Sequence, residues 1–345
     1  MQHTSNQWQF WVDRGGTFTD IVAKTPAGAL VTHKLLSDNP EQYPDAALAG
    51  IRYLLGIDSD QLIPTELIAA VKMGTTVATN ALLERKGDDT VLFMTAGFKD
   101  ALQIGYQARP QLFTRHIVKP ELLYGQVIEV QERVLADGTT EKPLNPAEVK
   151  QQLKAAYDQG YRAIAIVLMH SYRYHEHEQQ VAQWARELGF EQISVSHQVS
   201  ALMKLIGRGD TTVVDAYLSP GLRRYVNRVA SELDQVRLMF MQSNGGLTAA
   251  DHFQGKDAIL SGPAGGIVGM ARIAAAVGTD QLIGFDLTGT STDVSHYSGH
   301  FERVFETVVA GVRLRAPMMN IHTVAAGGGS IVHFDGQRMR VGPHS

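Results

Sequence analysis

The apolar residues of this chain follow two periods in turn, which predicts a fold of alternating strands and helices. Short apolar runs at 10–12, 18–23 and 30–36, separated by polar turns, are typical of strands. Helical spacing of apolar residues follows at 45–55 and again at 64–71, where a proline stands near the start. The N-terminal part therefore has the pattern of an α/β protein.

The same alternation continues through the middle of the chain. We expect a strand at 90–96, and helices at 145–159 and 176–188 that alternate with strands at 163–170 and 192–196. Strands that alternate with helices in this way imply a largely parallel sheet.

Residues 107–143 interrupt this order with prolines and isolated apolar positions. We expect an inserted subdomain there, with a strand pair flanking Asp137 and Gly138. The pattern then restarts near residue 211, with a helix expected at 219–233, a strand at 237–242, a helix at 264–277 and a strand at 281–286.

Length sharpens this picture. At 345 residues and 37.7 kDa, the chain exceeds the roughly 250 to 300 residues at which one hydrophobic core usually stops growing, so we expect two lobes. We place the boundary near residue 207, giving a first domain at 1–207 and a second at 208–345. A mean hydropathy of -0.10 fits an ordered soluble protein.

Charge and cysteine content exclude several function classes. The formal net charge of -4, without a basic block, gives no support for a nucleic-acid partner. Zero cysteines exclude a disulfide scaffold, thiolate metal sites and a cysteine nucleophile. We find neither a secretory signal nor an apolar segment of about 20 residues, and we expect a cytoplasmic protein without membrane contact.

One eight-residue segment occurs twice. DRGGTFTD at 13–20 matches DLTGTSTD at 286–293, and an apolar run precedes and follows each copy. Each copy predicts a strand–turn–strand hairpin. Glycines let backbone N–H groups approach phosphate oxygens, threonine hydroxyls add donors, and an aspartate can hold Mg²⁺ through water. The alternative for either copy alone is a tight turn without a ligand.

The paired hairpins resemble the two phosphate motifs of the actin-like ATPase superfamily. SGPAGGIVGMA at 261–271 agrees, because it precedes the second hairpin where that superfamily places a small-residue connecting helix. The resemblance implies an α/β, actin-like ATPase (ribonuclease H-like) fold with two lobes. A glycine-rich turn at a helix start is the simpler interpretation of 261–271.

Longer stretches narrow the resemblance to the hydantoinase A/5-oxoprolinase family, specifically the ATP-dependent 5-oxoprolinase type. These stretches are VDRGGTFTDIVA at 12–23, KLLSDNP at 34–40, GTTVATNALLERKG at 74–87, GFKDALQIGYQARPQLF at 97–113, RGDTTVVDAYLSP at 208–220, QSNGGL at 242–247 and APMMNIHTVAAGGGS at 316–330. The family implies hydrolysis of 5-oxo-L-proline to L-glutamate, with ATP and Mg²⁺ as cofactors. ATP is then expected to phosphorylate the amide oxygen and so make the ring carbon susceptible to water.

The resemblance also assigns site residues. Asp13 and Asp286 are our catalytic candidates and the expected water-mediated contacts to Mg²⁺. The expected phosphate-binding residues are Gly15, Gly16, Thr17 and Thr19 in one lobe and Gly289, Thr290 and Thr292 in the other.

Six further residues are substrate candidates, each with a structural alternative. Arg14 could neutralise phosphate or carboxylate charge, or be a solvated turn residue. Thr76 and Asn80 stand at a strand-to-helix turn, where they could bind the lactam or cap the helix. Arg208 and Asp210 could meet the substrate or form a salt bridge at a domain junction, and Asn244 could be a turn residue first.

The chain departs from the family pattern in two places. Thr288 replaces the usual glycine of the second loop, and its Cβ would be strained if φ were positive there. The chain also stops before the family's adenosine motif and second connecting helix. We therefore expect a truncated second lobe with exposed apolar surface, and weak or absent turnover by the chain alone.

Three functions stay open at this point. The first is the nucleotide-binding part of a 5-oxoprolinase; the second is a hydantoin hydrolase or ATP-dependent carboxylase subunit; the third is a non-catalytic remnant or partner-dependent subunit. The expected partners are a cyclic amide substrate and a hydantoinase B-like portion or subunit, and we expect the full-length form to be a homo-oligomer.

Overall fold

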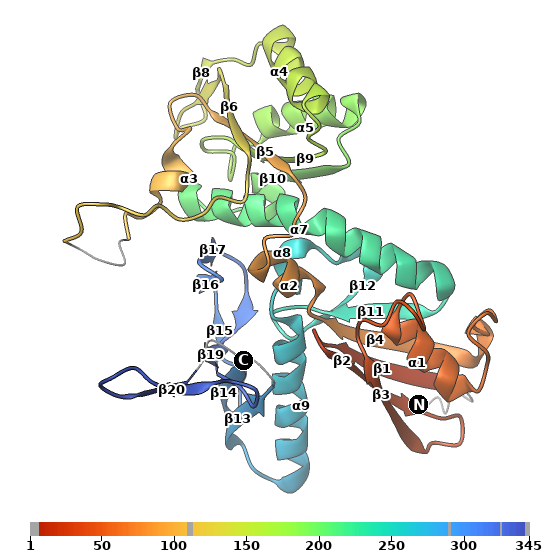
Figure 1. Ribbon diagram of the computed structural model, residues 1–345. Coiled ribbons are helices and arrows are strands. Elements are labelled where there is room, and N and C mark those ends of the chain that lie inside the picture. The colour runs from red at the N-terminus through yellow and green to blue at the C-terminus, as the bar shows by residue number, and fades with distance from the viewer. Residues whose placement is uncertain (1–6, 109–112, 289–290, 325, 342–345) are drawn as a thin grey trace.

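The computed structural model describes residues 7–108, 113–288, 291–324 and 326–341. Within these ranges the chain is an α/β protein with a six-stranded, a four-stranded and a three-stranded sheet, besides smaller strand pairs. Figure 1 shows three bodies: the six-stranded sheet at the right, the four-stranded sheet at the top, and the three-stranded sheet below beside a long helix.

The six-stranded sheet has the order β12-β11-β4-β1-β2-β3. Strands β1, β2 and β3 are antiparallel neighbours, whereas β4 pairs parallel with both β1 and β11. The bounds are β1 Trp8–Arg14, β2 Phe18–Lys24, β3 Leu30–Leu36, β4 Ile68–Thr75, β11 Arg237–Met241 and β12 Leu247–Ala249.

The helix predicted at 64–71 is wrong. Only a short 3₁₀ turn, Thr65–Leu67, precedes β4, which then runs through the middle of the sheet. Ile68, Val71 and Met73 of β4 are buried in the main core. Their partners β1 and β11 are remote in sequence, so the local pattern did not reveal this pairing.

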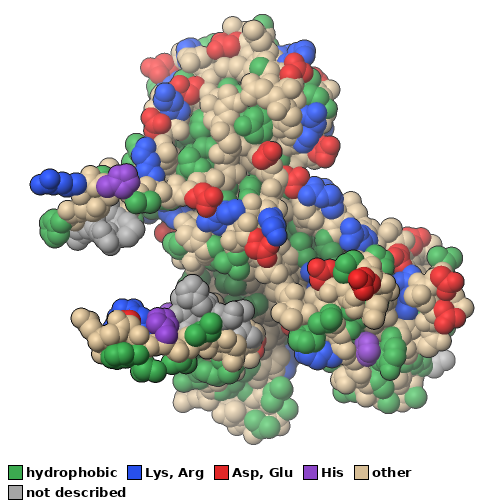
Figure 2. All heavy atoms as spheres, viewed as in Figure 1, with side chains coloured by type: hydrophobic (Ala, Val, Ile, Leu, Met, Phe, Trp, Pro, Cys, Tyr) green, Lys and Arg blue, Asp and Glu red, His purple; other side chains and the backbone are tan. Residues whose placement is uncertain are grey.

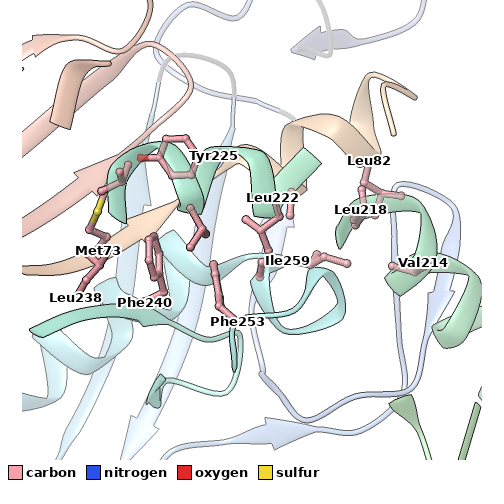
Figure 3. Close-up of a cluster of buried hydrophobic side chains, with 14 of the residues drawn as sticks. Met73, Leu82, Val214, Leu218, Leu222, Tyr225, Leu238, Phe240, Phe253 and Ile259 are labelled. Carbon is pink, nitrogen blue, oxygen red and sulfur yellow. The ribbon is translucent and has the colours of Figure 1, made fainter. Parts of the chain in front are cut away.

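Helix α7, Leu205–Glu232, shares a buried cluster with this sheet and is longer than the helix predicted at 219–233. Figure 3 shows Leu222 of α7 near Phe253 and Ile259, and Leu218 beside Leu82, all within one buried cluster. Tertiary burial keeps α7 continuous although Gly207, Gly209 and Pro220 disfavour a helix.

The four-stranded sheet is parallel and has the order β10-β9-β5-β6, as the predicted βαβ pattern requires. Strand β6 was wrongly included in the inserted subdomain expected at 107–143, because it pairs with β5 in this sheet. The strand pair expected around Asp137 and Gly138 is present as β7 and β8. The bounds are β5 Thr90–Thr95, β6 Gln126–Val130, β7 Arg133–Val134, β8 Thr140–Lys142, β9 Ala163–Val167, β10 Gln192–Val195, α4 Pro146–Asp158 and α5 Glu176–Leu188.

The third body contains α9, Ser261–Val277, and the antiparallel sheet β13-β14-β19. The strands of this sheet are β13 Gln281–Leu287, β14 Thr292–Ser298 and β19 His322–Val324. The same part of the chain also has the short strands β15 Arg303–Val304, β16 Thr307–Val309, β17 Val312–Leu314, β18 Met318–Met319, β20 Val332–Phe334 and β21 Met339–Val341. The remaining helices are α1 Ala46–Leu55, α2 Val77–Leu83, α3 Ala101–Ile104, α6 Ser196–Val199 and α8 Gly255–Ala258, with a 3₁₀ turn at Ala250–His252.

Packing divides the chain differently from the predicted domains. The boundary at residue 207 falls inside α7, and β11 and β12 from the second predicted domain complete the first sheet. The division into 1–207 and 208–345 stays a prediction from sequence.

One face of the third body is uncovered in the part of the chain that the structure describes. Ile283 and Phe285 of β13 are 72% and 69% exposed, whereas Phe10 and Val12 at the matching positions of β1 are 0% and 3% exposed. The latter pack in one cluster with Ala47 and Ile51 of α1. Figure 2 shows hydrophobic side chains on this lower body, which confirms the expected exposed apolar surface.

No helix among the described residues is long and apolar enough to span a membrane.

Candidate functional site

The two copies of the repeated segment fold into hairpins of the same register, which confirms the predicted strand–turn–strand units. In β1–β2, Asp13 is paired with Asp20, and in β13–β14, Asp286 is paired with Asp293. The third strands match as well, because Leu35 of β3 is paired with Thr19 and Val324 of β19 with Thr292. The repeat is therefore a unit of three strands, longer than the sequence match indicates.

The first loop is closed by a backbone hydrogen bond from the Gly15 N–H to the Phe18 carbonyl, 3.0 Å long. A Cβ at Gly15 would stand 2.9 Å from that carbonyl oxygen, so the close approach requires glycine. Gly16 and Thr17 are exposed at the tip. Their backbone N–H groups are the ones in this loop that an anion could approach.

The second loop makes the same bond with Thr288 in place of Gly15. The Thr288 N–H donates to the Ser291 carbonyl at 2.9 Å, and the Thr288 hydroxyl donates to the same carbonyl at 3.0 Å. Thr288 is not among the residues with positive φ, so the strain we expected there is wrong. Gly289 and Thr290, the predicted phosphate contacts at the tip, lie outside the described residues.

Asp13 lies next to the last residue of the first strand and is exposed, with β4 and α9 beside its carboxyl. Its Oδ1 faces Gly74 at the end of β4 and Gly262 at the start of α9, where an added Cβ would stand 3.3 Å and 3.5 Å away. The surrounding protein raises the pKa of the Asp13 carboxyl, and the negative charges of Asp20 and Asp286 raise it further, against an opposing effect of Lys34. The aspartates of the two hairpins are therefore close enough to interact.

The second aspartate of each hairpin has a different neighbour. Lys34 forms an exposed ion pair with Asp20 at 2.8 Å. At the matching position of β19, Thr323 donates a hydrogen bond to Asp293 at 2.6 Å, and burial together with the charge of Asp286 raises the pKa of the Asp293 carboxyl. The second hairpin thus keeps two carboxylates without a lysine at this position.

A cavity of about 560 Å³ adjoins the second hairpin, between α9 and the strands β13 and β14. Asp286 and Asp293 line it beside apolar residues of α9 such as Ile267 and Met270. Its size is in the range of small-molecule sites. The carboxylates of Asp286 and Asp293 therefore lie at one part of a largely apolar cavity.

Thr76 and Asn80 lie beside the first loop. The Thr76 N–H and hydroxyl both donate to the Arg14 carbonyl, at 3.1 Å and 3.2 Å. The Asn80 amide donates to the Thr76 hydroxyl at 3.3 Å, and a Cβ at Gly16 would stand 3.4 Å from that amide nitrogen. Helix α2 thus presents an amide to the loop tip, whereas Thr76 makes no side-chain cap.

Arg14 is held on the other face of β1 from Asp13, because neighbouring residues of a strand point to opposite faces. Its guanidinium stacks on the Tyr225 ring at 5.2 Å, and its Nε is buried without a hydrogen-bond partner among the described residues. The structure therefore packs Arg14 against α7, and not in a solvated turn.

Thr19 and Thr292 do not have the phosphate-facing positions that we predicted. Both are buried, and their hydroxyls are bonded inside the protein: Thr19 to Ser37 at 2.9 Å and Thr292 to the Ala326 carbonyl at 2.6 Å. Each lies on the face of the hairpin opposite to the aspartates. Thr19 and Thr292 therefore make hydrogen bonds on the buried side of their hairpins and not at the loop tips.

Arg208 does not meet Asp210, and neither is free for a substrate. Arg208 is fully buried and donates to Ser196 Oγ and to the carbonyls of Leu168, Leu202 and Met203. Asp210 pairs with Arg313 at 2.6 Å. A salt bridge was the structural alternative for this segment, and Asp210 makes one.

Asn244 accepts a hydrogen bond from the Gly246 N–H at 2.7 Å, which is a turn contact. Two histidines, His177 of α5 and His197 of α6, also make side-chain pairs within the protein. His177 pairs with buried Glu132 at 2.6 Å, and His197 pairs with buried Glu178 at 2.7 Å. Among the described residues, no group of three or more His, Asp or Glu side chains is arranged as a direct metal site.

Three residues of this site were missed from sequence: Gly74, Gly262 and Ser37. Gly74 and Gly262 border the Asp13 carboxyl, and Ser37 contacts the first loop from the end of β3. Each lies in a stretch that carried the family resemblance. For Gly74 and Gly262, a glycine at the end of a strand or at a helix start was the available signal.

Comparison with known proteins agrees with this architecture. One similar solved structure, an ATP-dependent caprolactamase from Pseudomonas jessenii, superposes with a TM-score of 0.82 at 30% identity, over 98% of this chain and 51% of that chain. A nucleotide-free acetone carboxylase superposes with a TM-score of 0.79 at 23% identity, over 98% and 51% of the two chains. The predicted α/β, actin-like ATPase fold is confirmed.

Curated relatives include 5-oxoprolinase 1 of Arabidopsis thaliana, 45% identical over 98% of this chain, and 5-oxoprolinase of Saccharomyces cerevisiae, 40% identical over 97%. The chain spans 29% of the length of each. Residues 9–189 match the hydantoinase/oxoprolinase N-terminal region, and residues 208–345 match the hydantoinase/oxoprolinase domain that follows it. This chain therefore belongs to the hydantoinase/oxoprolinase family.

Proposed function

We propose that this chain binds ATP between its two hairpins and provides the nucleotide site for ATP-dependent opening of a cyclic amide. The supporting observation is the matched pair of hairpins, whose first strands carry Asp13 and Asp286 at the same register position and within reach of each other's charge. Two such loops can hold a phosphate chain from both sides. A single tight turn would not explain why both copies keep this register.

The residues present fit a magnesium nucleotide. Gly74 and Gly262 leave space beside the Asp13 carboxyl that side chains would narrow. Mg²⁺ usually keeps several waters and takes only one or two carboxylates, so Asp13 and Asp286 would hold it through water. A cation between Asp13 and Asp286 would also offset the repulsion between the two carboxylates, since the charge of Asp286 is one of the causes that raise the pKa of Asp13.

The chemistry divides between the nucleotide and the chain. ATP supplies the phosphoryl group that activates the amide for attack by water. The N–H groups of Gly16 and Thr17 would bind phosphate oxygens, and the Asn80 amide beside Gly16 would orient either the phosphate or the lactam. Most of the protein's contribution is therefore positioning and charge neutralisation.

The substrate we propose is 5-oxo-L-proline, opened to L-glutamate, which is a step of glutathione metabolism. Identity favours this assignment: 45% to a 5-oxoprolinase, against 31% to a caprolactamase subunit alpha and 28% to an acetophenone carboxylase gamma subunit. Hydantoin hydrolysis or carboxylation is the alternative within the same family.

The caprolactamase and acetophenone carboxylase relatives are subunits by name, so we propose that this chain acts with a hydantoinase B-like portion or subunit. We also propose that it acts in the cytoplasm and that the full-length form is a homo-oligomer. A non-catalytic remnant is the competing proposal. Nucleotide binding would distinguish the two.

An assay of ADP release tests the substrate class. The chain, alone and with a hydantoinase B-like protein, is given Mg-ATP and one of 5-oxoproline, hydantoin or caprolactam. We expect the largest stimulation with 5-oxoproline when the second protein is present. A larger response to hydantoin or caprolactam would move the assignment to the alternative.

A further inference from the structure

Ser37 lies directly after β3 and makes three contacts with the first loop. It is 5% exposed. Its hydroxyl donates to the Gly15 carbonyl at 2.7 Å, and its N–H donates to the Thr17 carbonyl at 2.9 Å. The Thr19 hydroxyl stands 2.9 Å from Ser37 Oγ. Because the single Ser37 hydroxyl proton is given to Gly15, Thr19 is the donor to Ser37.

The second hairpin is held in the same way by a different sequence. Thr19 and Thr292 occupy matching register positions, so Ser37 and Ala326, each two residues beyond the paired third-strand residue, match as well. The Thr292 hydroxyl donates to the Ala326 carbonyl at 2.6 Å, and the Gly328 N–H donates to the Thr288 carbonyl at 2.9 Å. The glycine-rich segment 326–330 thus corresponds to the residues around Ser37.

These contacts determine which way the loop peptides face. In a trans peptide the carbonyl and the following N–H point in opposite directions. Since the Gly15 carbonyl points to Ser37, the Gly16 N–H points away from Ser37, toward the exposed side of the loop. An N–H held outward before a ligand arrives loses less freedom when it binds an anion.

We propose that Ser37 is a positioning residue that orients the first loop for phosphate. This inference rests on the proposed function, because the anion it concerns is the nucleotide phosphate. Ser37 touches the loop backbone from the side opposite to the tip, and it acts only through Gly15 and Thr17.

The test compares Ser37→Ala with Thr19→Val and with a matched control, Thr90→Val. Thr90 is 1% exposed and donates to the Asp88 carbonyl at 2.9 Å in the four-stranded body, so its variant also loses one buried hydroxyl bond. Two quantities are measured: hydrogen exchange of residues 14–18 without nucleotide, and the Kd for Mg-ATP by calorimetry.

We expect exchange at 14–18 to rise at least several-fold in Ser37→Ala, to rise less in Thr19→Val, and to stay unchanged in Thr90→Val. The Kd of Ser37→Ala should rise about tenfold, the equivalent of one net hydrogen bond. The melting temperature should fall in all three variants, so it cannot account for a difference in exchange or affinity.

Equal exchange at 14–18 in Ser37→Ala and Thr90→Val would overturn the positioning role. An unchanged Kd in Ser37→Ala, with faster exchange, would also overturn it, because the orientation would then not matter to the phosphate. If the unaltered chain bound no Mg-ATP, the proposed function would fail first, while the exchange comparison would still decide whether Ser37 orders the loop.

Discussion

Asp13 and Asp286 stand at the same register position of two three-stranded units, and the charge of Asp286 is one of the causes that raise the pKa of Asp13. The segments that carry them are 273 residues apart in sequence. Folding therefore brings two like charges together and keeps small residues around one of them. Such an arrangement costs stability and is typical of a binding site.

The raised pKa of Asp13 predicts that Asp13→Asn stabilises the fold at neutral pH. The charged form is disfavoured in the folded state relative to the unfolded chain, in which the pKa of the Asp13 carboxyl is near its ordinary value of 3.8. The loss of folding stability that this causes is complete above the pKa of Asp13 in the folded state, and it is absent below the pKa of Asp13 in the unfolded chain. Melting curves should show a higher midpoint for the variant at pH 7 and a difference that narrows as the pH falls toward 4.

Asp137→Asn is the matched control of opposite sign. Hydrogen bonds from Thr139, led by its backbone N–H at 2.9 Å, lower the pKa of Asp137, so its charge stabilises the fold above the unfolded pKa. Its replacement should lower the midpoint at pH 7 and matter less at acid pH. A lower midpoint for Asp13→Asn at pH 7 would contradict the claim that the folded protein disfavours the charged Asp13 carboxylate.

Gly262→Ala should weaken Mg-ATP binding several-fold while the chain stays folded. The new methyl would stand 3.5 Å from Asp13 Oδ1, which is an ordinary contact, but it narrows the space beside the carboxyl. Gly269 lies two turns further along α9, outside the lining of the cavity and with nothing within 4 Å, so Gly269→Ala should leave affinity unchanged and stabilise the helix by about 0.5–1 kcal/mol. Equal affinities of the two variants would exclude Gly262 from the site.

Thr288→Gly should not improve nucleotide binding. Thr288 has no positive φ, and its hydroxyl bonds to the Ser291 carbonyl, so glycine would remove a contact and add freedom to the unfolded chain. We expect a loss of about 1 kcal/mol in the free energy of unfolding and a Kd for Mg-ATP within twofold of the original. A clearly tighter Kd would show that the threonine side chain obstructs the phosphate.

Arg208→Met should lower the free energy of unfolding and should have no specific effect on substrate binding. Its buried guanidinium bonds to three carbonyls and Ser196, and Glu178 lies near it. Loss of such a group costs about 3–5 kcal/mol of unfolding free energy. The control Arg224→Met, which breaks an exposed pair with Asp88, should cost about 1 kcal/mol or less in the same denaturant titration.

The hairpins could be predicted from sequence because their information is local. Alternating apolar residues, a glycine turn and a second copy identify both units, and the structure gives them the same register. Helix α5 was predicted with its observed bounds, 176–188, because it carries a clear apolar face and a glycine directly after its end.

Other elements depend on contacts that no local pattern contains. Strand β4 has the apolar spacing of a helix but lies between β1 and β11, and α7 begins at Leu205 because burial overrides Gly207 and Gly209. The face of a strand on which a polar side chain lies could not be predicted from the sequence either. Thr19 has the residue type of a phosphate ligand, but it lies on the buried face, where its hydroxyl bonds to Ser37.

Calorimetric titration of Mg-ATP into the chain, beside Asp13→Asn and Asp286→Asn, tests the central claim most directly. We predict a saturable heat with one site for the unaltered chain, at least tenfold weaker in either variant, and no such heat when EDTA removes the Mg²⁺. No saturable heat for the unaltered chain, or equal affinity in all three proteins, would contradict a nucleotide site between the two hairpins.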